Sequence, residues 1–375
     1  VELWGECYNI AETITLDLSN LNIPGEIPIE VWQLTNLNYL HLNGNQFNGE
    51  IPSEVSNLNN LIGLYLQENQ LSGEIPEEIE SLTNLTHIYL YENELSGEIP
   101  EEIWKLTNLN YLYLNGNQLY GQIPEEVADL TNLTGLFLHE NQLSGIIPSQ
   151  LGSLSNLEYL RLSNNQFSGE IPNEIGALIN LTYLNFGLNN FSGPIPNSIG
   201  NLNQLTELYF TDNQIGGPLP ESIGDLHNLT MLSLYGNQIN GPIPNSIGNL
   251  VNLISLNAGY NQLSGEMPES IGNLVLLERL WLNYNNLSGY LPDSICNLTN
   301  VSWSPDGFDG ESSYVCYNQL CPPYPECIQD NVGPQFTEEC PEIDLGDVNF
   351  DGILNILDII NIVNIILNNN YNELA

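Results

Sequence analysis

A 24-residue period organises most of this chain of 375 residues. Residues 109–132, with the sequence LNYLYLNGNQLYGQIPEEVADLTN, represent the unit. Eleven such units follow one another from Leu37 to Asn300 without an insertion or a deletion, and a looser copy precedes them from Thr13 to Asn36. Self-similarity this strict predicts a solenoid, in which each coil contacts only its neighbours and all coils share one continuous core.

The apolar positions divide each unit into three parts. The first part fits a short strand whose inward leucines stack on those of the next coil, and a second apolar pair then flanks a turn glycine. Pro124 fixes the entry to a short helical turn, which carries the third pair inward on the outer side. In the representative unit these positions are Leu109, Leu112 and Leu114, then Leu119 and Ile123, then Val127 and Leu130.

An asparagine ends the strand of every full unit. It is Asn117 in the representative unit, and it recurs in all eleven copies from Asn45 to Asn285. A buried amide at a tight bend must satisfy its donors and its acceptor. We therefore predict a ladder of asparagines that bonds the backbones of neighbouring coils, which is a structural role.

The complete pattern is L-x-x-L-x-L-x-x-N-x-L-x-G-x-I-P-x-x-I-x-x-L-x-x. It resembles the leucine-rich repeat of plant receptor ectodomains and polygalacturonase-inhibiting proteins, which also occurs in some secreted bacterial proteins. The resemblance implies an α/β repeat fold, a right-handed solenoid with a concave parallel β-sheet and short 3-10 or helical turns on its convex side. It does not imply a particular ligand, because fold does not fix function.

We expect four segments. Residues 1–36 form an N-terminal cap with the first imperfect repeat, and residues 37–300 form the eleven full repeats. Residues 301–341 carry most of the cysteines and are expected to cap the C-terminal end, since an uncapped solenoid would expose apolar surface. Residues 342–375 form a separate segment with its own spacing of polar residues, which is described below.

The charge balance restricts the partners of the chain. Three Lys and Arg residues stand against 46 Asp and Glu residues, for a net charge of −43. Such a surface repels phosphate backbones and anionic membranes, which argues against nucleic acid and lipid as partners. The sequence also lacks the run of about 18 apolar residues that membrane insertion requires. Because the chain starts at Val1 without a basic and apolar leader, we expect the mature form of an exported protein.

Side chains that alternate with the inward leucines should line the concave face. Many are aromatic, which sheet propensity alone could explain, although contiguous exposed aromatic side chains tend to mark binding surfaces. We predict a binding track for a peptide, protein or glycan. Its first row contains His41, Tyr65, Tyr89, Tyr113, Phe137, Arg161, Asn185 and Tyr209; its second row contains Tyr39, His87, Tyr111, Tyr159 and Tyr183; and the strand ends add Tyr91, Glu68, Glu92 and Glu140.

An enzyme is not expected. His41, His87 and His139 lie about 10 Å or more apart on strands spaced by about 4.8 Å, so they form neither a metal cluster nor a triad. Glu68 and Glu92 are one coil apart, close to the separation that retaining glycosidases use, but an open sheet has no pocket to desolvate an acid.

The six cysteines indicate an oxidising compartment. Cys7 lies twelve coils, about 55 Å at one strand spacing per coil, from the others and is too far away to pair with them. At least two cysteines should therefore lie outside disulfides unless chains are crosslinked. The candidates for the disulfides of the C-terminal cap are Cys296, Cys316, Cys321, Cys327 and Cys340.

The last segment carries the spacing of a calcium loop. Oxygen ligands fall at positions 1, 3, 5, 9 and 12, a glycine at position 6 permits the sharp turn, and position 7 contributes a backbone carbonyl. The predicted Ca²⁺ ligands are Asp347, Asn349, Asp351, Ile353, Asn355 and Asp358. The lead GDVNFDG and the final Asp resemble one half of a dockerin module, which implies an EF-hand-like segment that attaches to a cohesin-like partner. The following helix is apolar on nearly every side, so we expect it to be buried against a second half, the solenoid end or another chain.

The leading hypothesis is a secreted or cell-surface, non-enzymatic recognition protein of a marine bacterium, with calcium-dependent attachment through its C-terminal module. A second hypothesis is a self-assembling subunit of a surface layer or filament, since contacts between solenoid ends propagate when they do not close. A third is an inhibitor of a polysaccharide-degrading enzyme, which rests on the resemblance alone.

Overall fold

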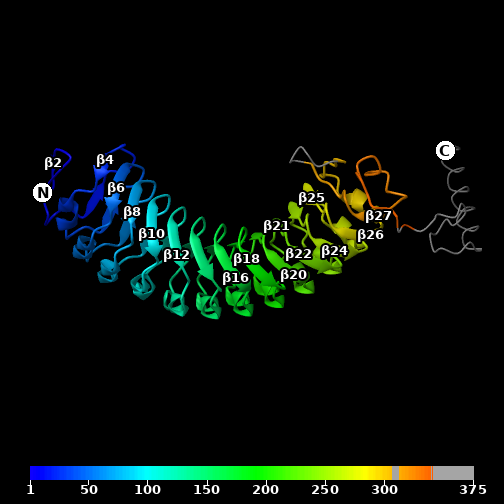
Figure 1. Cartoon of the computed structure of the whole chain (residues 1–375), viewed down its shortest axis with the longest axis horizontal. Helices are drawn as coiled ribbons and strands as arrows, with labels where there is room; N and C mark the ends of the chain where they lie inside the picture. The colour runs from blue at the N-terminus through cyan, green and yellow to red at the C-terminus, as the bar shows by residue number, and fades with distance from the viewer. Residues whose placement is uncertain (306–311, 339, 341–375) are drawn as a thin grey trace, which may run out of the picture.

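The computed structural model describes residues 1–305, 312–338 and 340, and their coils stack into an arc (Figure 1). The predicted leucine-rich solenoid with parallel strands is confirmed. The expected calcium loop of residues 347–358 and the EF-hand-like segment of residues 342–375 lie outside the described residues. No helix among the described residues has the length and apolar character to cross a membrane.

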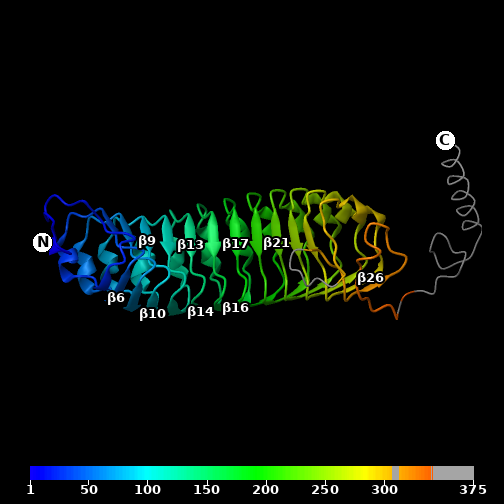
Figure 2. The same ribbon diagram turned by 90° about the horizontal axis from the view of Figure 1, so that it is seen from above.

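A twelve-stranded parallel sheet lines the concave side of the arc (Figure 2). Each coil adds one strand of three residues, because the alternating leucines of the repeat bury one face of that strand. The strands are β3 (Thr15–Asp17), β5 (Tyr39–His41), β7 (Gly63–Tyr65), β9 (His87–Tyr89), β11 (Tyr111–Tyr113), β13 (Gly135–Phe137), β15 (Tyr159–Arg161), β17 (Tyr183–Asn185), β19 (Glu207–Tyr209), β21 (Met231–Ser233), β23 (Ser255–Asn257) and β25 (Arg279–Trp281).

A second parallel sheet, of thirteen strands, runs along one flank of the arc and was not predicted (Figure 2). It is built from the segment that follows each ladder asparagine. Its strands are β4 (Pro24–Glu26), β6 (Gln46–Glu50), β8 (Gln70–Gly73), β10 (Glu94–Glu98), β12 (Gln118–Gly121), β14 (Gln142–Gly145), β16 (Gln166–Glu170), β18 (Asn190–Gly193), β20 (Gln214–Pro218), β22 (Gln238–Gly241), β24 (Gln262–Gly265), β26 (Asn286–Tyr290) and β27 (Gln319–Cys321).

Short 3-10 helices form the convex side, each starting directly after a proline as expected (Figure 1). They are η1 (Ile29–Gln33), η2 (Ser53–Asn57), η3 (Glu77–Ser81), η4 (Glu101–Lys105), η5 (Glu125–Asp129), η6 (Ser149–Ser153), η7 (Asn173–Ala177), η8 (Asn197–Asn201), η9 (Glu221–Asp225), η10 (Asn245–Asn249), η11 (Glu269–Asn273) and η12 (Asp293–Asn297). The leucine positions of every coil, such as Leu112 and Leu130, are buried and join one continuous core. At the N-terminal end, β1 (Glu2–Leu3) pairs with β2 (Glu6–Cys7) and buries Leu3 against that core.

The predicted asparagine ladder is present in full. Asn117 Nδ2 donates to the carbonyl oxygens of Leu90 and Leu114, both at 3.0 Å. Its Oδ1 accepts a hydrogen bond from the backbone N–H of Leu95 at 3.0 Å. Leu90 and Leu95 belong to the preceding coil, so each asparagine closes its own bend and binds the coil before it.

The residue before each ladder asparagine has a left-handed backbone conformation. Glycine occupies this position at Gly44, Gly116 and Gly236, where it adopts that conformation without steric cost. Other residues hold it elsewhere, including Glu68, Glu92, Glu140, Asn164, Leu188, Asp212, Tyr260 and Tyr284. A non-glycine residue is disfavoured there by roughly 1 kcal/mol or more, so the ladder bonds must impose the conformation.

The C-terminal cap contains one further coil, which the period did not reveal. Asn318 donates to the carbonyl oxygen of Leu282 at 2.9 Å, and its Oδ1 accepts from the N–H of Leu287 at 3.0 Å. β27 extends the second sheet beside β26, and Tyr317 takes the left-handed position before the asparagine. Asn318 lies 33 residues after Asn285 instead of 24, and this insertion hides the coil in the sequence.

Two disulfides hold this cap: one joins it to the last full coil, and the other lies within the cap. Cys296 in η12 pairs with Cys327, and Cys321 in β27 pairs with Cys340. The disulfide-bearing cap is therefore as expected, with one correction. Cys316 was a candidate, but it lies outside both disulfides because it faces the core as a small buried side chain. Cys7 is exposed at the other end and also lies outside both.

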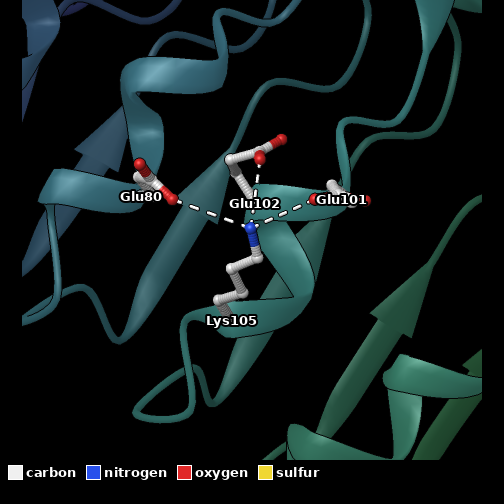
Figure 3. A network of polar contacts seen from close by, with 4 residues as sticks. All are labelled: Glu80, Glu101, Glu102 and Lys105. Carbon is white, nitrogen blue, oxygen red and sulfur yellow. Dashed lines mark hydrogen bonds and ion pairs between the residues drawn. The ribbon is translucent and has the colours of Figure 1, made fainter.

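The convex side carries a local cluster around Lys105, the single lysine of the chain (Figure 3). Its Nζ lies 3.1 Å from Glu102 and 3.2 Å from Glu101 on the same turn, and 3.8 Å from Glu80 on η3. These are the ion pairs found among the described residues, and surface pairs of this kind contribute little stability. Most of the acidic side chains therefore face solvent without a cationic partner.

Candidate functional site on the concave face

Strand register places the first predicted row side by side along the sheet. His41 pairs with Tyr65, Tyr65 with Tyr89, and Tyr89 with Tyr113. The row then continues through Phe137, Arg161, Asn185 and Tyr209. Adjacent strands of one parallel sheet thus present one side chain per coil, about 4.8 Å apart.

The rings from β5 to β13 are in mutual contact. We call this set the aromatic track; it consists of His41, Tyr65, Tyr89, Tyr113, Phe137, His87 and Tyr111. His41 stacks on Tyr65 with centroids 4.3 Å apart, and Tyr89 stacks on Tyr113 at 4.5 Å with planes 5° apart. His87 and Tyr111 lie beside them in the second row, 5.2 Å apart. The N-terminal half of the face is therefore one continuous aromatic surface.

Two glycines of the second row make room for these rings. A Cβ on Gly135 would lie 2.9 Å from Tyr111 Cδ1 and 3.2 Å from Tyr113 Cε1. A Cβ on Gly63 would come closer still to the ring of Tyr65, at 2.5 Å from its Cε2. Both glycines let neighbouring rings lean over the sheet, so the packing of the aromatic track depends on positions that carry no side chain.

Burial and mutual proximity shift the ionisation of the aromatic track. Burial, together with the neighbouring tyrosines, raises the pKa of Tyr89 to about 12 and raises the pKa of Tyr113 as well. Burial lowers the pKa of His87, which favours its neutral form. At neutral pH the track therefore presents neutral hydroxyls and apolar ring surface.

Acidic side chains flank the aromatic track at the strand ends. Tyr91 donates a hydrogen bond to Glu68 Oε1 at 3.3 Å, and desolvation followed by the charge of Glu68 raises the pKa of Tyr91. Glu92 and Glu140 occupy the equivalent position in other coils. The predicted strand-end residues thus form an acidic border along one side of the rings.

Two of the concave-face histidines lie on separate strands, His41 on β5 and His87 on β9. His139 is only 5% exposed, and burial followed by the nearby Arg161 lowers its pKa to about 3, so it stays neutral. No group of three or more His, Cys, Asp or Glu side chains that could hold a metal ion occurs among the described residues.

The track ends at Arg161 and Asn185, so the predicted aromatic row is divided. Tyr159 lies 6.3 Å from Phe137 at this border. Beyond it, Tyr183 and Tyr209 form a separate pair with ring centroids 5.7 Å apart. Tyr209 donates to Glu207 Oε2 at 2.7 Å, and Asn185 donates to the Tyr183 hydroxyl at 3.2 Å.

A small hollow of about 110 Å³ lies next to this pair and was not predicted. It forms because β21 and β23 present small side chains, Ser233 and Ser255, between the large rings of Tyr209 and Trp281. The Arg279 guanidinium lies 6.0 Å from the Trp281 ring, and its buried Nε has no hydrogen-bond partner among the described residues. The sequence reveals such a hollow only when the side-chain sizes of several adjacent coils are compared.

A third aromatic group lies on the flank near the cap and was also missed. Tyr260 stacks on Tyr284 and Tyr284 on Tyr317, each pair with centroids 4.3 Å apart. All three occupy the left-handed position before a ladder asparagine, and Tyr260 is 45% exposed. They do not belong to the concave sheet, because each follows a strand of that sheet in the sequence.

Comparison with known families agrees with this architecture. Profiles described as leucine rich repeat match residues 60–119 and 123–167, and single repeats match 36–58, 180–202, 204–226, 228–250, 252–274 and 276–298. The chain belongs to the leucine-rich-repeat family. Among curated proteins, no sequence matches it.

Several solved structures are similar. The crystal structure of PEPR1–AtPEP1 is 35% identical with a TM-score of 0.79, and the match covers 85% of this chain and 43% of that one. The Arabidopsis receptor kinase HAESA, solved with the peptide hormone IDA and the co-receptor SERK1, is 31% identical with a TM-score of 0.63 over 86% of this chain and 61% of that one. A leucine-rich-repeat protein of Leptospira interrogans is 34% identical with a TM-score of 0.65, over 81% and 72%. The chain thus spans less than two thirds of the PEPR1 and HAESA chains.

Proposed function

We propose that this chain is an extracellular, non-enzymatic recognition protein that binds a peptide or protein segment across its concave face. The observation that carries the proposal is the aromatic track, in which Tyr89 and Tyr113 stack at the centre of a continuous, half-buried ring surface. Tyrosine-rich surfaces supply most of the binding energy in many interfaces. HAESA, whose repeats resemble these, was solved with a peptide hormone.

The hollow beside Arg279 supports a ligand that extends along the face. Its volume of about 110 Å³ fits one small side chain between Tyr209 and Trp281. The Arg279 guanidinium, 6.0 Å from the Trp281 ring that lines the hollow, favours an acidic group nearby, since a guanidinium binds carboxylates well. The acidic border of the aromatic track favours basic groups at the other end of the same ligand.

The two disulfides support an extracellular location, since disulfides persist in oxidising compartments. The calcium loop of residues 347–358 remains a prediction of the sequence. In this proposal it serves as an attachment module and takes no part in ligand recognition.

Selection from a random peptide library on the immobilised chain tests the proposal, followed by titration calorimetry with the enriched peptides. The double variant Tyr89→Ala/Tyr113→Ala should bind them about a hundredfold more weakly, because each ring at a hot spot contributes more than about 1 kcal/mol. Tyr120→Ala is the matched control, since Tyr120 lies in the second sheet and is 48% exposed. Equal affinity of the double variant for every enriched peptide would overturn the proposal.

Gly135→Ala provides a second test that leaves every ring in place. The added Cβ displaces the rings of Tyr111 and Tyr113, so affinity should fall and the near-ultraviolet circular dichroism of the stacked tyrosines should change. Gly216→Ala is the control, because the nearest atom to its Cβ is 3.6 Å away and its backbone is not left-handed.

A further inference from the structure

A polar hollow of about 600 Å³ crosses four coils at the flank where the concave strands begin. The second sheet follows the other end of those strands, so the hollow lies on the opposite flank. Four of its five lining amides recur once per coil, at Asn60, Asn84, Asn108 and Asn132. The fifth, Asn110, donates to the carbonyl oxygen of Asn132 at 3.0 Å. We call it the amide groove. Its lining residues, all within the described part of the chain, carry amides, a hydroxyl and one isoleucine, but no charge.

The amides of this groove are held in fixed orientations. Asn84 Nδ2 donates to the carbonyl oxygen of Asn59 at 2.9 Å, and Asn108 Nδ2 donates to that of Thr83 at 2.8 Å. Asn132 makes the equivalent bond to Thr107. Each of these exposed amides thus uses one N–H for a bond to the coil before it, which leaves its second N–H and its Oδ1 for a ligand. The groove presents one donor and one acceptor per coil, already ordered.

The repeat distance of these amides selects among uncharged polymers. Neighbouring coils are about 4.8 Å apart, which is close to the length of one hexose unit in an extended glycan. Equivalent groups on one edge of an extended peptide recur about every 6.6 Å, so within two coils they no longer lie opposite the amides of the groove. A paired donor and acceptor also match the neighbouring hydroxyls of a sugar, each of which donates and accepts.

Aromatic rings border the groove on the concave side. His87 and Tyr111 directly follow the lining residues Thr86 and Asn110, and their ring centroids are 5.2 Å apart. The Thr86 hydroxyl lies 2.7 Å from His87 Nδ1, which fixes that ring. Rings beside fixed amides offer the two contacts that a sugar needs, an apolar surface for its C–H groups and partners for its hydroxyls.

We infer that the amide groove binds a neutral polysaccharide, with one hexose unit per coil from Asn60 to Asn132. The net charge of −43 repels uronic acid, sulfated and phosphorylated polymers, so the glycan must be uncharged. The inference does not rest on the proposed peptide site, since it uses side chains at the start of the strands and not the Tyr89–Tyr113 stack.

Titration calorimetry with cellohexaose, laminarihexaose and mannohexaose, and gel retardation in the corresponding soluble polysaccharides, tests the inference on the full chain. We expect the wild-type chain to bind at least one neutral series and not polygalacturonate. Asn84→Ala/Asn108→Ala should weaken that binding about tenfold or more, since it removes two ordered donor and acceptor pairs.

Asn156→Ala/Asn180→Ala is the matched control. Asn156 and Asn180 make the same bond to the preceding coil, both at 2.8 Å, but lie outside the groove. Both double variants should unfold at the same temperature, while the control keeps wild-type affinity for the glycan. Absence of binding to every neutral probe, or equal loss in both variants, would overturn the inference. Tyr89→Ala/Tyr113→Ala should retain glycan binding, which separates this site from the proposed peptide site.

Discussion

The Asn318 amide nitrogen lies 2.9 Å from the Leu282 carbonyl oxygen, and Asn285 makes the same contact with Ala258 at 2.9 Å one coil earlier. The cap therefore continues the hydrogen bonding of the repeats and does not merely cover their end. Because the ladder runs without a break from Asn45 into the cap, its asparagines should be the residues on which stability most depends.

Replacement of one buried ladder residue should destabilise the chain strongly. Asn165 accepts a hydrogen bond from the Leu143 N–H and donates to the Leu138 carbonyl, both at 2.9 Å. Asn165→Ala leaves the Leu143 N–H buried without a partner, at about 1–3 kcal/mol. It also removes one of the two side-chain hydrogen bonds that the Leu138 carbonyl accepts, the other coming from Asn141 at 3.2 Å. We expect a clear fall in the urea concentration at the midpoint of unfolding, with little change in the dependence of the free energy of unfolding on urea. Asn156→Ala removes one exposed bond and should have a much smaller effect; equal effects would contradict the structural role of the ladder.

Stability should fall at high pH as the aromatic track ionises. The fold raises the pKa of Tyr89 to about 12 and also raises that of Tyr113, whereas unfolded tyrosine ionises near about 10. The folded state therefore holds these protons more tightly. The stability that they contribute is complete below about pH 10 and is lost as the pH rises through the folded pKa values.

Spectrophotometric titration of tyrosinate absorbance measures this effect. It should show a late phase that Tyr113→Phe reduces, and thermal unfolding should follow the same pH range. A titration complete near pH 10 in the folded chain would show that the rings are not desolvated.

Alkylation followed by intact mass measurement checks the cysteine assignment. In the native chain iodoacetamide should modify Cys7, which is exposed, and leave Cys316, which is buried. Unfolding without a reductant should add modification of Cys316. The other four cysteines should react only after reduction, because they form the Cys296–Cys327 and Cys321–Cys340 disulfides. A different order of modification would show another pairing.

The calcium loop predicts one saturable site. Calorimetric titration of the full chain with calcium should detect it, and Asp347→Ala/Asp358→Ala should remove it, since both substitutions delete carboxylate ligands of the loop. Glu125→Ala/Glu126→Ala is the control, because it removes the same charge from the convex side. Calcium uptake that falls equally in both variants would indicate general attraction to an acidic surface.

Periodicity alone predicted the part of the fold that each unit specifies by itself. The inward leucines such as Leu112, the ladder residue Asn117 and the turn after Pro124 all lie as expected. The second sheet was missed because segments such as Gln118–Gly121 contain one buried leucine and a glycine, which give no strand alternation. The coil around Asn318 was missed because an insertion shifts it out of the period.

The site was predictable only where one row of side chains defines it. Strand alternation placed Tyr65, Tyr89 and Tyr113 on one surface. The hollow at Arg279 depends instead on small residues in two coils between large residues in two others, and the stacked Tyr260 and Tyr284 depend on a left-handed backbone position outside the strands. These features arise between coils, so no single unit encodes them.

Because each ladder asparagine bonds only its own bend and the coil before it, every junction along the solenoid carries the same ladder hydrogen bonds. A duplication or loss of 24 codons in frame would add or remove a whole coil and leave every other junction satisfied. The molecule can therefore change its length, and with it the span of the target that it covers. No genetic step on that route leaves a ladder asparagine without its backbone partners.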